Sequence, residues 1–288
     1  IYDAGIKTEL FPLLIFIGVG AMIDFSPLLS QPSLVLLGAA GQFGIYFTLL
    51  LAIVLGFPLR EAAAIGSIGA IDGPTAIFVG ERLAPNILAP IAVAAYSYMS
   101  LIPIIQPPIM RLMTTRKERL IRMEYSPKPV SRLTLVLFPI IVTLLVAFVA
   151  PDAASLMAAL MLGNLLREAL VVDRLSKMVQ NELINIATLF LGLAIGSTMT
   201  AQSFLNLDTL KILALGLLAF VVDTIAGLLF GKLMAVVTHG KVNPLVGACG
   251  ISAFPMAGRL SAKMALEEDP SNFILMHAMG ANTAGQLG

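Results

Sequence analysis

Three long stretches without charge are the feature that most constrains the fold of this chain. Residues 34–59, 87–110 and 183–207 contain no Asp, Glu, Lys or Arg. A transmembrane helix needs about 20 predominantly apolar residues, so each stretch is long enough to cross a bilayer. Only 12% of the 288 residues are charged, which is about half the share typical of soluble domains. The sequence therefore predicts an all-α polytopic membrane protein.

The order of apolar and polar segments predicts two membrane halves. The one long polar insert, residues 111–132, holds seven Lys or Arg against two Glu. The positive-inside rule therefore places it in the cytoplasm. We interpret it as a basic linker between a first membrane repeat, residues 1–110, and a second, residues 133–288. The alternative is a docking surface for a cytoplasmic partner. Because the chain begins with Ile and stops inside an apolar pattern, we expect both repeats to be truncated.

An internal repeat supports this division. The pattern Gly-x2-Gly-x4-Pro begins at Gly66 and again at Gly247. Glycine and proline interrupt helices, and broken backbone persists at membrane depth only where protein buries it or a cavity receives it. Paired interrupted segments in two halves mark the binding site of many transporters. We therefore predict a two-repeat, transporter-like helical bundle with two broken transmembrane helices. Two merely kinked helices are the alternative, and a parallel or an inverted repeat is left open.

The acid Asp72 lies inside the first broken segment, in the stretch GSIGAIDGPTAIFV. A charged side chain at the bilayer centre costs at least about 2.5–3.5 kcal/mol, and Asp72 has no basic residue within one helical turn. A carboxylate surrounded by carbonyl and amide oxygens is a site for a hard cation. Since protonation removes the charge, H+ and a metal ion would compete for it. We therefore predict a sodium or proton site, with a protonated structural aspartate as the alternative.

Further polar side chains accompany the broken segments. Asn243, Ser252 and Arg259 lie in or beside the second one, and Asn282 lies in the last apolar run. Amide and hydroxyl oxygens suit a cation, whereas an arginine holds a carboxylate in bidentate geometry. For Arg259 the alternative is a snorkelling residue at a helix end, and for Asn282 it is close helix packing. Tyr98 offers a hydroxyl after Asp72, although a tyrosine of the core is equally natural there.

Other features of the sequence narrow the range of possible functions. Asp223 lies in the middle of an unbroken apolar run, where no free carbonyls are expected, so we interpret it as an interhelical hydrogen-bonding residue. The single Cys249 excludes a disulfide within the chain. A net charge of +1 without a basic, aromatic patch gives no sign of nucleic-acid binding. Without a Walker P-loop the chain is not expected to hydrolyse ATP.

Five segments resemble one known family. They are IKTELFPLLIFIGVGAMIDFSPLL, GSIGAIDGPTAIFV, VAAYSYMSLIPIIQPPIMR, NPLVGACGISAFPMAGR and HAMGANTAGQLG. Together they resemble the beta subunits of the sodium-pumping, biotin-dependent decarboxylases of oxaloacetate, methylmalonyl-CoA and glutaconyl-CoA. The resemblance runs from about Gly5 to Gly288.

The resemblance implies a defined reaction in a bacterial or archaeal cytoplasmic (inner) membrane. A carboxyltransferase alpha subunit loads biotin, and a biotin carrier domain brings carboxybiotin to the membrane subunit. There carboxybiotin is decarboxylated with uptake of a proton, and sodium ions are driven out of the cell. A small membrane-anchored gamma or delta subunit and a homotrimeric membrane core are also implied. The substrate of the whole complex is chosen by another subunit and stays open.

The resemblance also implies roles for single residues. Asp72 is expected to bind sodium and exchange it for a proton, with Asn282 as the second ligand. Arg259 and Ser252 are the expected contacts of carboxybiotin, and Tyr98 is expected to handle sodium or protons. The remaining residues implied along the ion path are Asn243, Ser252 and Gly247.

Two rival functions use the same residues. A sodium/proton antiporter or sodium-coupled carboxylate transporter would employ the same repeat and Asp72, but it would need no biotin carrier. A subunit that only anchors a soluble enzyme would tolerate substitution of Asp72 and Asn282 and depend on the basic linker.

Overall fold

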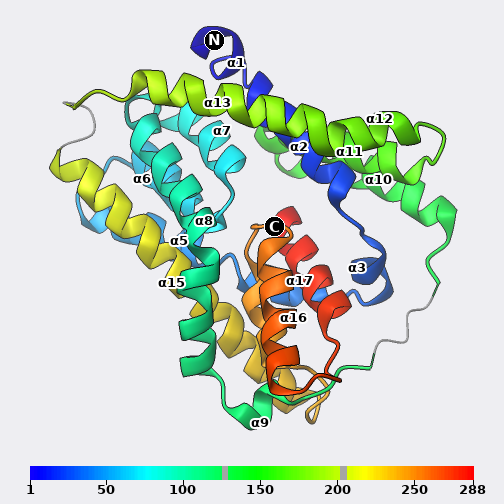
Figure 1. Ribbon diagram of the computed structural model, residues 1–288. Helices are drawn as coiled ribbons and strands as arrows, with labels where there is room; N and C mark the ends of the chain where they lie inside the picture. The colour runs from blue at the N-terminus through cyan, green and yellow to red at the C-terminus, as the bar shows by residue number, and fades with distance from the viewer. Residues whose placement is uncertain (125–128, 202–205) are drawn as a thin grey trace. The chain divides into compact units, whose positions relative to one another are not determined.

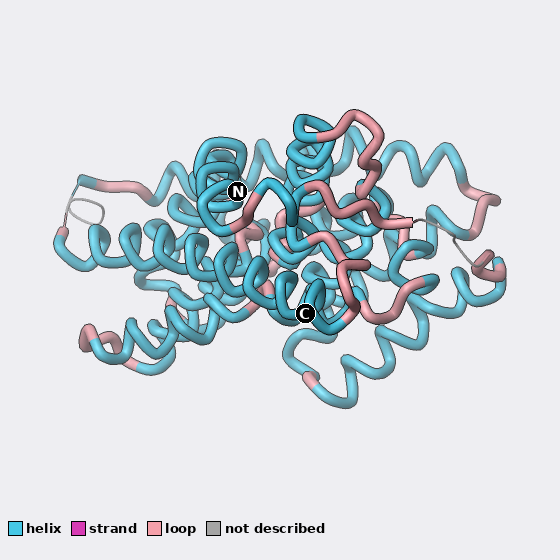
Figure 2. Tube along the Cα trace, turned by 90° about the horizontal axis from the view of Figure 1, so that it is seen from below, coloured by secondary structure: helices cyan, strands magenta, loops and turns pink. Residues whose placement is uncertain are grey.

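The computed structural model describes residues 1–124, 129–201 and 206–288. Within these ranges every regular element is helical (Figure 2). Residues 125–128 of the predicted linker and residues 202–205 of the third charge-free stretch lie outside the described part. Among the described residues, five helices are long and apolar enough to cross a membrane, which confirms the predicted all-α polytopic class. These candidate spans are Leu34–Val54, Pro85–Met113, Arg132–Val149, Asp173–Thr198 and Leu207–Val237.

The helices group into two compact units, each continuous in space but not in sequence. Unit 1 comprises residues 1–26 and 129–200, and unit 2 comprises residues 27–128 and 201–288. This partition follows packing and differs from the predicted halves, which follow sequence order. The boundaries of the two repeats therefore stay a prediction. The helices of unit 1 are α1 (Tyr2–Gly5), α2 (Leu10–Met22), α10 (Arg132–Val149), η3 (Pro151–Ala153), α11 (Ala154–Glu168), α12 (Asp173–Met178), η4 (Val179–Leu183) and α13 (Ile184–Thr198).

The helices of unit 2 begin with α3 (Ser26–Ser30), whose first residue belongs to unit 1, and most of its α-helices are labelled in Figure 1. The others are α4 (Leu34–Ala40), α5 (Phe43–Val54), α6 (Leu59–Gly66), η1 (Ser67–Ala70), α7 (Gly73–Leu83), η2 (Pro85–Ile87), α8 (Leu88–Met113), α9 (Arg116–Arg119), α15 (Leu207–Val237), η5 (Pro244–Gly250), α16 (Met256–Glu268) and α17 (Leu275–Leu287).

Unit 1 is held together where α2 and α11 approach each other through glycines. A Cβ atom on Gly20 would lie 1.8 Å from the carbonyl oxygen of Leu160, and one on Gly163 would lie 1.9 Å from that of Ile17. Because lipid tails are as apolar as leucine, membrane helices associate through such close packing and through interhelical hydrogen bonds. Asn164 adds one such bond, donated to the carbonyl of Ile23 at 2.9 Å.

The first broken segment of unit 2 is a re-entrant hairpin, here called hairpin 1 (residues 59–83). It enters as α6 and η1, turns at Ile71 and Asp72, and returns as α7. Ile71 has a φ of +55° and Asp72 an extended backbone, so neither residue continues the helix. Asn86, just after α7, donates to the Glu61 carboxylate in the first turn of α6 at 2.9 Å. The two ends of hairpin 1 therefore lie together at its base.

The second broken segment has the same form and is called hairpin 2 (residues 244–268). It enters as η5, turns through residues 251–255 and returns as α16. Asn243 at its start donates to the carbonyls of Arg119 and Ile121, and Glu268 at its end pairs with the Arg119 guanidinium at 2.7 Å. Both ends of hairpin 2 thus lie at the polar segment that contains Arg119.

The long helix α15 shows that the two hairpins enter from opposite sides. Lys211 near its start lies 5.6 Å from the ring centre of Phe57, next to the base of hairpin 1. Lys232 pairs at 3.2 Å with Glu118, next to the base of hairpin 2. At 1.5 Å per residue these lysines are about 32 Å apart along the helix, close to the thickness of a bilayer's hydrocarbon core. If the two segments are repeats, they are related in the inverted manner.

Candidate functional site

The two hairpin tips meet inside unit 2. The backbone N–H of Ser252, in the tip of hairpin 2, donates to the carbonyl of Ala70, at the tip of hairpin 1, at 3.0 Å. A Cβ on Gly250 would lie 2.3 Å from the carbonyl oxygen of Leu37, and one on Gly285 only 2.0 Å from that of Gly250. Glycine therefore allows the second tip to press against α4 and α17. The backbone freed from helical bonding at both tips is enclosed by protein, as broken backbone at membrane depth requires.

Asp72 is positioned by the turn of hairpin 1. It is the N-cap residue of α7, and Pro74 in the first turn of that helix has no N–H to leave unpaired. Its carboxylate oxygen Oδ2 accepts from the Thr75 hydroxyl and, at 3.4 Å, from the Gln286 side-chain amide of α17. Only 7% of Asp72 is exposed, and among the described residues it forms no ion pair. A buried carboxylate with neutral partners needs a proton or a cation.

Polar groups from three segments gather around the second tip. Asn282 of α17 donates to the Ile251 carbonyl at 2.7 Å, and Ser252 donates to the Gly285 carbonyl at 2.8 Å. Gln42, between α4 and α5, donates to the carbonyls of Gly250 and Gly285 at 2.8 and 3.0 Å. The oxygen Oδ1 of Asn282 is buried without a hydrogen-bond partner in the described chain. It is therefore an acceptor available to a cation.

These contacts bring together three of the predicted residues. Asp72, Ser252 and Asn282 lie at or against the two tips, and Gln286 links α17 to Asp72. Carboxylate, amide, hydroxyl and carbonyl oxygens are the ligands of hard cations. The donor chemistry therefore fits a hard cation such as sodium.

Tyr98 lies on α8 and packs against the apolar cluster that contains Ile71 and Ile251 of the two tips. Its hydroxyl donates to the carbonyl of Leu213 on α15 at 2.6 Å, and a Cβ on Gly216 of α15 would lie 2.8 Å from its ring. The neighbouring Tyr96 instead lies against the residue after Asp72, because a Cβ on Gly73 would lie 2.5 Å from the Tyr96 ring. The role of Tyr98 in ion handling stays a prediction.

The remaining predicted residues are spread along hairpin 2. Asn243 is the N-cap residue of η5 at the base of the hairpin, where its oxygen Oδ1 accepts from Leu245. Gly247 lies within η5, where a Cβ would be 2.0 Å from the carbonyl oxygen of Gly227 on α15. Arg259 lies in the first turn of α16 with an exposed side chain. None of these three contacts Asp72 in the described structure, so their place on the ion path stays a prediction.

The structure confirms the interpretation of Asp223 as an interhelical hydrogen-bonding residue. From the middle of α15 its Oδ1 accepts from the backbone N–H of Gly44 in α5. It is fully buried, and it joins two helices rather than the two hairpin tips.

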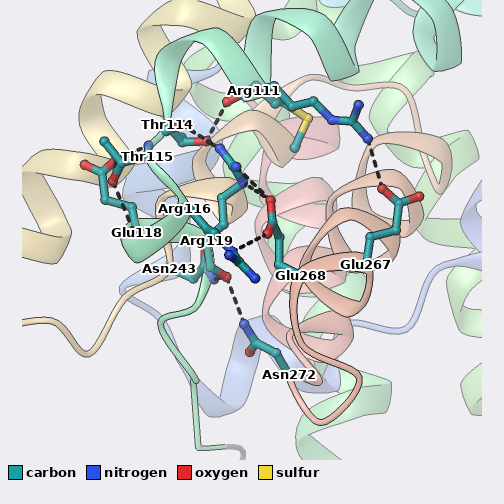
Figure 3. A network of polar contacts seen from close by, with 11 residues as sticks. Arg111, Thr114, Thr115, Arg116, Glu118, Arg119, Asn243, Glu267, Glu268 and Asn272 are labelled. Atoms are coloured by element: carbon teal, nitrogen blue, oxygen red, sulfur yellow. Dashed lines mark hydrogen bonds and ion pairs between the residues drawn. The ribbon is translucent and has the colours of Figure 1, made fainter.

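A polar network fixes the base of hairpin 2 (Figure 3). Arg119 pairs with Glu268 at 2.7 Å and donates to the Thr114 carbonyl at 2.6 Å. Around it, Arg111 pairs with Glu267 and Arg116 with Glu268, at 3.1 and 3.2 Å. Four arginines of the predicted linker, counting Arg122 with Asp269 at 2.6 Å, thus meet acids at the end of α16. Much of the linker's positive charge is therefore used within the chain.

This network lowers the pKa values of two acids that belong to it. Hydrogen bonding and charge from Arg119, helped by Arg116, lower the pKa of Glu268. The backbone N–H of Ser271 and the Arg122 guanidinium lower the pKa of Asp269. Each carboxylate is therefore held in its charged form at neutral pH.

Sequence reasoning missed three residues of the site, namely Gln42, Thr75 and Gln286. Gln286 follows Asn282 by four residues, so helical spacing placed both on one face of α17 and was a usable signal. Gln42 is a polar residue within a charge-free stretch, which was a weaker signal. Thr75 follows Asp72 by three residues at the start of α7. No spacing rule distinguished it from an ordinary residue of a first helical turn.

Comparison with known proteins agrees with the resemblance. The family described as Na+-transporting oxaloacetate decarboxylase beta subunit matches residues 1–288. The methylmalonyl-CoA decarboxylase subunit beta of Veillonella parvula is 54% identical over 286 residues, which cover 99% of this chain and 76% of the relative. The oxaloacetate decarboxylase beta chain of Klebsiella pneumoniae is 54% identical over 293 residues, which cover 100% of this chain and 67% of the relative.

A third relative is named as a subunit of a decarboxylase that acts on another substrate. The glutaconyl-CoA decarboxylase subunit beta of Acidaminococcus fermentans is 52% identical over 284 residues, which cover 99% of this chain and 76% of the relative. This chain belongs to the family of Na+-transporting oxaloacetate decarboxylase beta subunits.

Proposed function

We propose that this chain is the membrane subunit that decarboxylates carboxybiotin, takes up a proton and couples the reaction to sodium export. The observation that carries this proposal is the buried, unpaired Asp72 at the meeting point of two re-entrant hairpins. Family membership supplies the reaction class, because the matched family is Na+-transporting and its named relatives are decarboxylases.

A single carboxylate can couple the two flows. Ionised Asp72 attracts sodium, together with the oxygens of Asn282 and Ser252, whereas protonated Asp72 has lost the charge that holds the ion. When the bond between the ureido nitrogen and the carboxyl carbon of carboxybiotin breaks, its electron pair stays on nitrogen. The nitrogen takes the proton and carbon dioxide leaves. Proton consumption thus returns Asp72 to the ionised form that binds sodium again.

Other residues have proposed roles in the same cycle. The exposed Arg259, one turn beyond the second tip, suits the carboxylate of carboxybiotin, with Ser252 as a neighbouring polar contact. Tyr98 stabilises α8 against α15 through its bond to Leu213, and we propose that it influences ion handling through that packing. Asn243 and Gly247 hold hairpin 2 in place.

The proposed partners follow from the reaction. Carboxybiotin has to arrive on a biotin carrier domain that a carboxyltransferase alpha subunit has loaded. A small membrane-anchored gamma or delta subunit and a homotrimeric membrane core complete the proposed complex. The named relatives belong to enzymes of three different substrates, and we propose that the alpha subunit makes this choice.

The decisive experiment is decarboxylation of free carboxybiotin by the purified membrane complex, titrated with NaCl against KCl. We expect sodium-specific activation in the wild type and a fall of at least about a hundredfold in Asp72→Asn, since the amide cannot exchange a proton. Asp208→Asn, which removes an exposed carboxylate at the start of α15, is the matched control and should keep the activity.

The same experiment separates the rival functions. Sodium-dependent turnover that survives in Asp72→Asn would contradict the role of Asp72. Sodium binding without any decarboxylation would indicate an antiporter or a carboxylate transporter, against which family membership speaks. Tolerance of substitutions at both Asp72 and Asn282 would indicate a subunit that only anchors a soluble enzyme.

A further inference from the structure

A cavity of about 430 Å³ lies at the base of hairpin 2, on the side of the basic linker. Its walls come from five segments: Ser33 and Leu34 at the start of α4, Arg122 in the linker, Met234 near the end of α15, Lys241 just before η5, and His277 on α17. The volume falls in the range of small-molecule sites. None of the residues assigned to the ion site lines this cavity.

The cavity has one apolar wall and one charged wall. Leu34, Leu37 and Met234 contribute the apolar side. Lys241 is exposed and forms no ion pair within the described ranges, whereas Arg122 is already paired with Asp269 at 2.6 Å. Lys241 is therefore the cation available to a bound anion.

Two further groups complete the polar wall. Glu124 lines the cavity, and its backbone accepts a hydrogen bond from the His277 side chain. This bond ties the linker to α17 across the cavity. The cavity thus offers a cation, a carboxylate acceptor and an apolar surface to a ligand of modest size.

We propose that this cavity is the entry site for the carboxylated ureido ring of carboxybiotin: it receives the ring when the carrier arrives from the cytoplasm, before the ring moves on to Arg259 and the hairpin tips. The inference rests on the proposed function, which supplies the ligand. Lys241 meets the carboxylate, Leu34, Leu37 and Met234 cover the sulfur-containing ring, and Glu124 accepts from the remaining ureido N–H. These groups match the ligand's charge, apolar body and single donor.

The place of the cavity separates recognition from ion binding. His277 lines the cavity and Gln286 contacts Asp72. These residues lie nine positions apart on α17, or about 14 Å at 1.5 Å per residue. A ring held in the cavity is therefore about this far from Asp72 along α17. The cavity accordingly affects how well the loaded ring binds and leaves sodium affinity unchanged.

The first test measures KM and kcat for free carboxybiotin with the purified membrane complex. Lys241→Met should raise KM about tenfold, the usual effect of losing a hydrogen bond to a charged group, with kcat and the half-saturating sodium concentration unchanged. Lys117→Met is the matched control, because Lys117 is an exposed linker lysine outside the cavity. An unchanged KM in Lys241→Met would overturn this proposal. The proposed function would still stand, because it is tested by turnover of the wild type.

The second test needs no turnover and measures protection from chemical labelling. A maleimide should modify Ser33→Cys slowly when free biotin is present, whereas modification of Lys117→Cys should keep its rate. The native Cys249 is fully buried and does not compete. Protection by inorganic phosphate equal to that by biotin, or no protection by biotin, would overturn the assignment to the ring.

Discussion

At the residue scale, glycines decide how closely the hairpin tips and their neighbours approach. The carbonyl of Gly250 lies where a side chain on Gly285 would have to stand, and Gly41 faces the same segment. A methyl group at such a position has backbone as its neighbour, which cannot swing aside as a side chain can. Gly192 on α13 is different, because a Cβ there would meet nothing within 4 Å.

We expect opposite effects from the same substitution at these two positions. Gly285→Ala should lower the free energy of unfolding by about 1–3 kcal/mol, the usual effect of overpacking, and should impair sodium binding because it pushes α17 from the tip. Gly192→Ala should raise stability by about 0.5–1 kcal/mol, since it removes the flexibility of a helical glycine. Thermal unfolding of the purified complex measures both. Equal stability of the two variants would show that the tip tolerates displacement.

At the element scale, the ion pairs at the base of hairpin 2 couple its position to pH. The pKa of Glu268 is lowered from an ordinary value of 4.5 and that of Asp269 from 3.8. For a lowered carboxyl pKa, the stabilisation is present above the unfolded value and is lost as pH falls through the folded one. The network therefore holds hairpin 2 at neutral pH and weakens in acid.

This gives a prediction for the exchange of backbone amides in the linker. After correction for intrinsic rates, the amides of residues 115–122 should lose protection when pH falls from about 6 to below the ordinary glutamate value of 4.5. In Arg119→Gln they should be less protected already at pH 6, and the further loss in acid should be smaller. A wild-type protection pattern that does not change with pH would show that Asn243 and Asn272 hold the base without these charges. Both side-chain amides donate to the carbonyls of Arg119 and Ile121.

At the scale of the whole molecule, the sequence predicted the all-α membrane class because apolar length and helix breakers are local properties. The breaks after Gly66 and Gly247 were visible for the same reason. The contacts between Ser252 and Ala70, or between Gln286 and Asp72, join positions about two hundred residues apart. No local pattern encodes such pairs, so the sequence selected Asp72 by its energetic cost and left its partners unknown.

The side from which each hairpin enters the membrane also could not be predicted from the sequence and had to be taken from the structure. The sequence leaves a parallel or an inverted repeat open, because the apolar run 154–166 is short for a membrane span. Whether or not it is counted as a crossing decides the predicted symmetry of the repeat. In the structure α11 (Ala154–Glu168) belongs to unit 1, so it does not enter the comparison of the two hairpins. Contacts along α15 within unit 2 settle the opposite entry of the hairpins without such a count.

Opposite entry predicts the side from which each hairpin base is reached by a reagent. Arg60 is exposed at the base of hairpin 1 and Lys117 is exposed at the base of hairpin 2. In intact cells, a membrane-impermeant maleimide should modify Arg60→Cys and leave Lys117→Cys unmodified until the membrane is permeabilised. The buried Cys249 should remain unlabelled in both variants. Labelling of both positions in intact cells, or of neither, would place the bases on one side and require a parallel arrangement. Labelling from opposite sides would instead mean that each hairpin can expose the tips by moving. Asp72 would then be the group that can be reached from either side of the membrane.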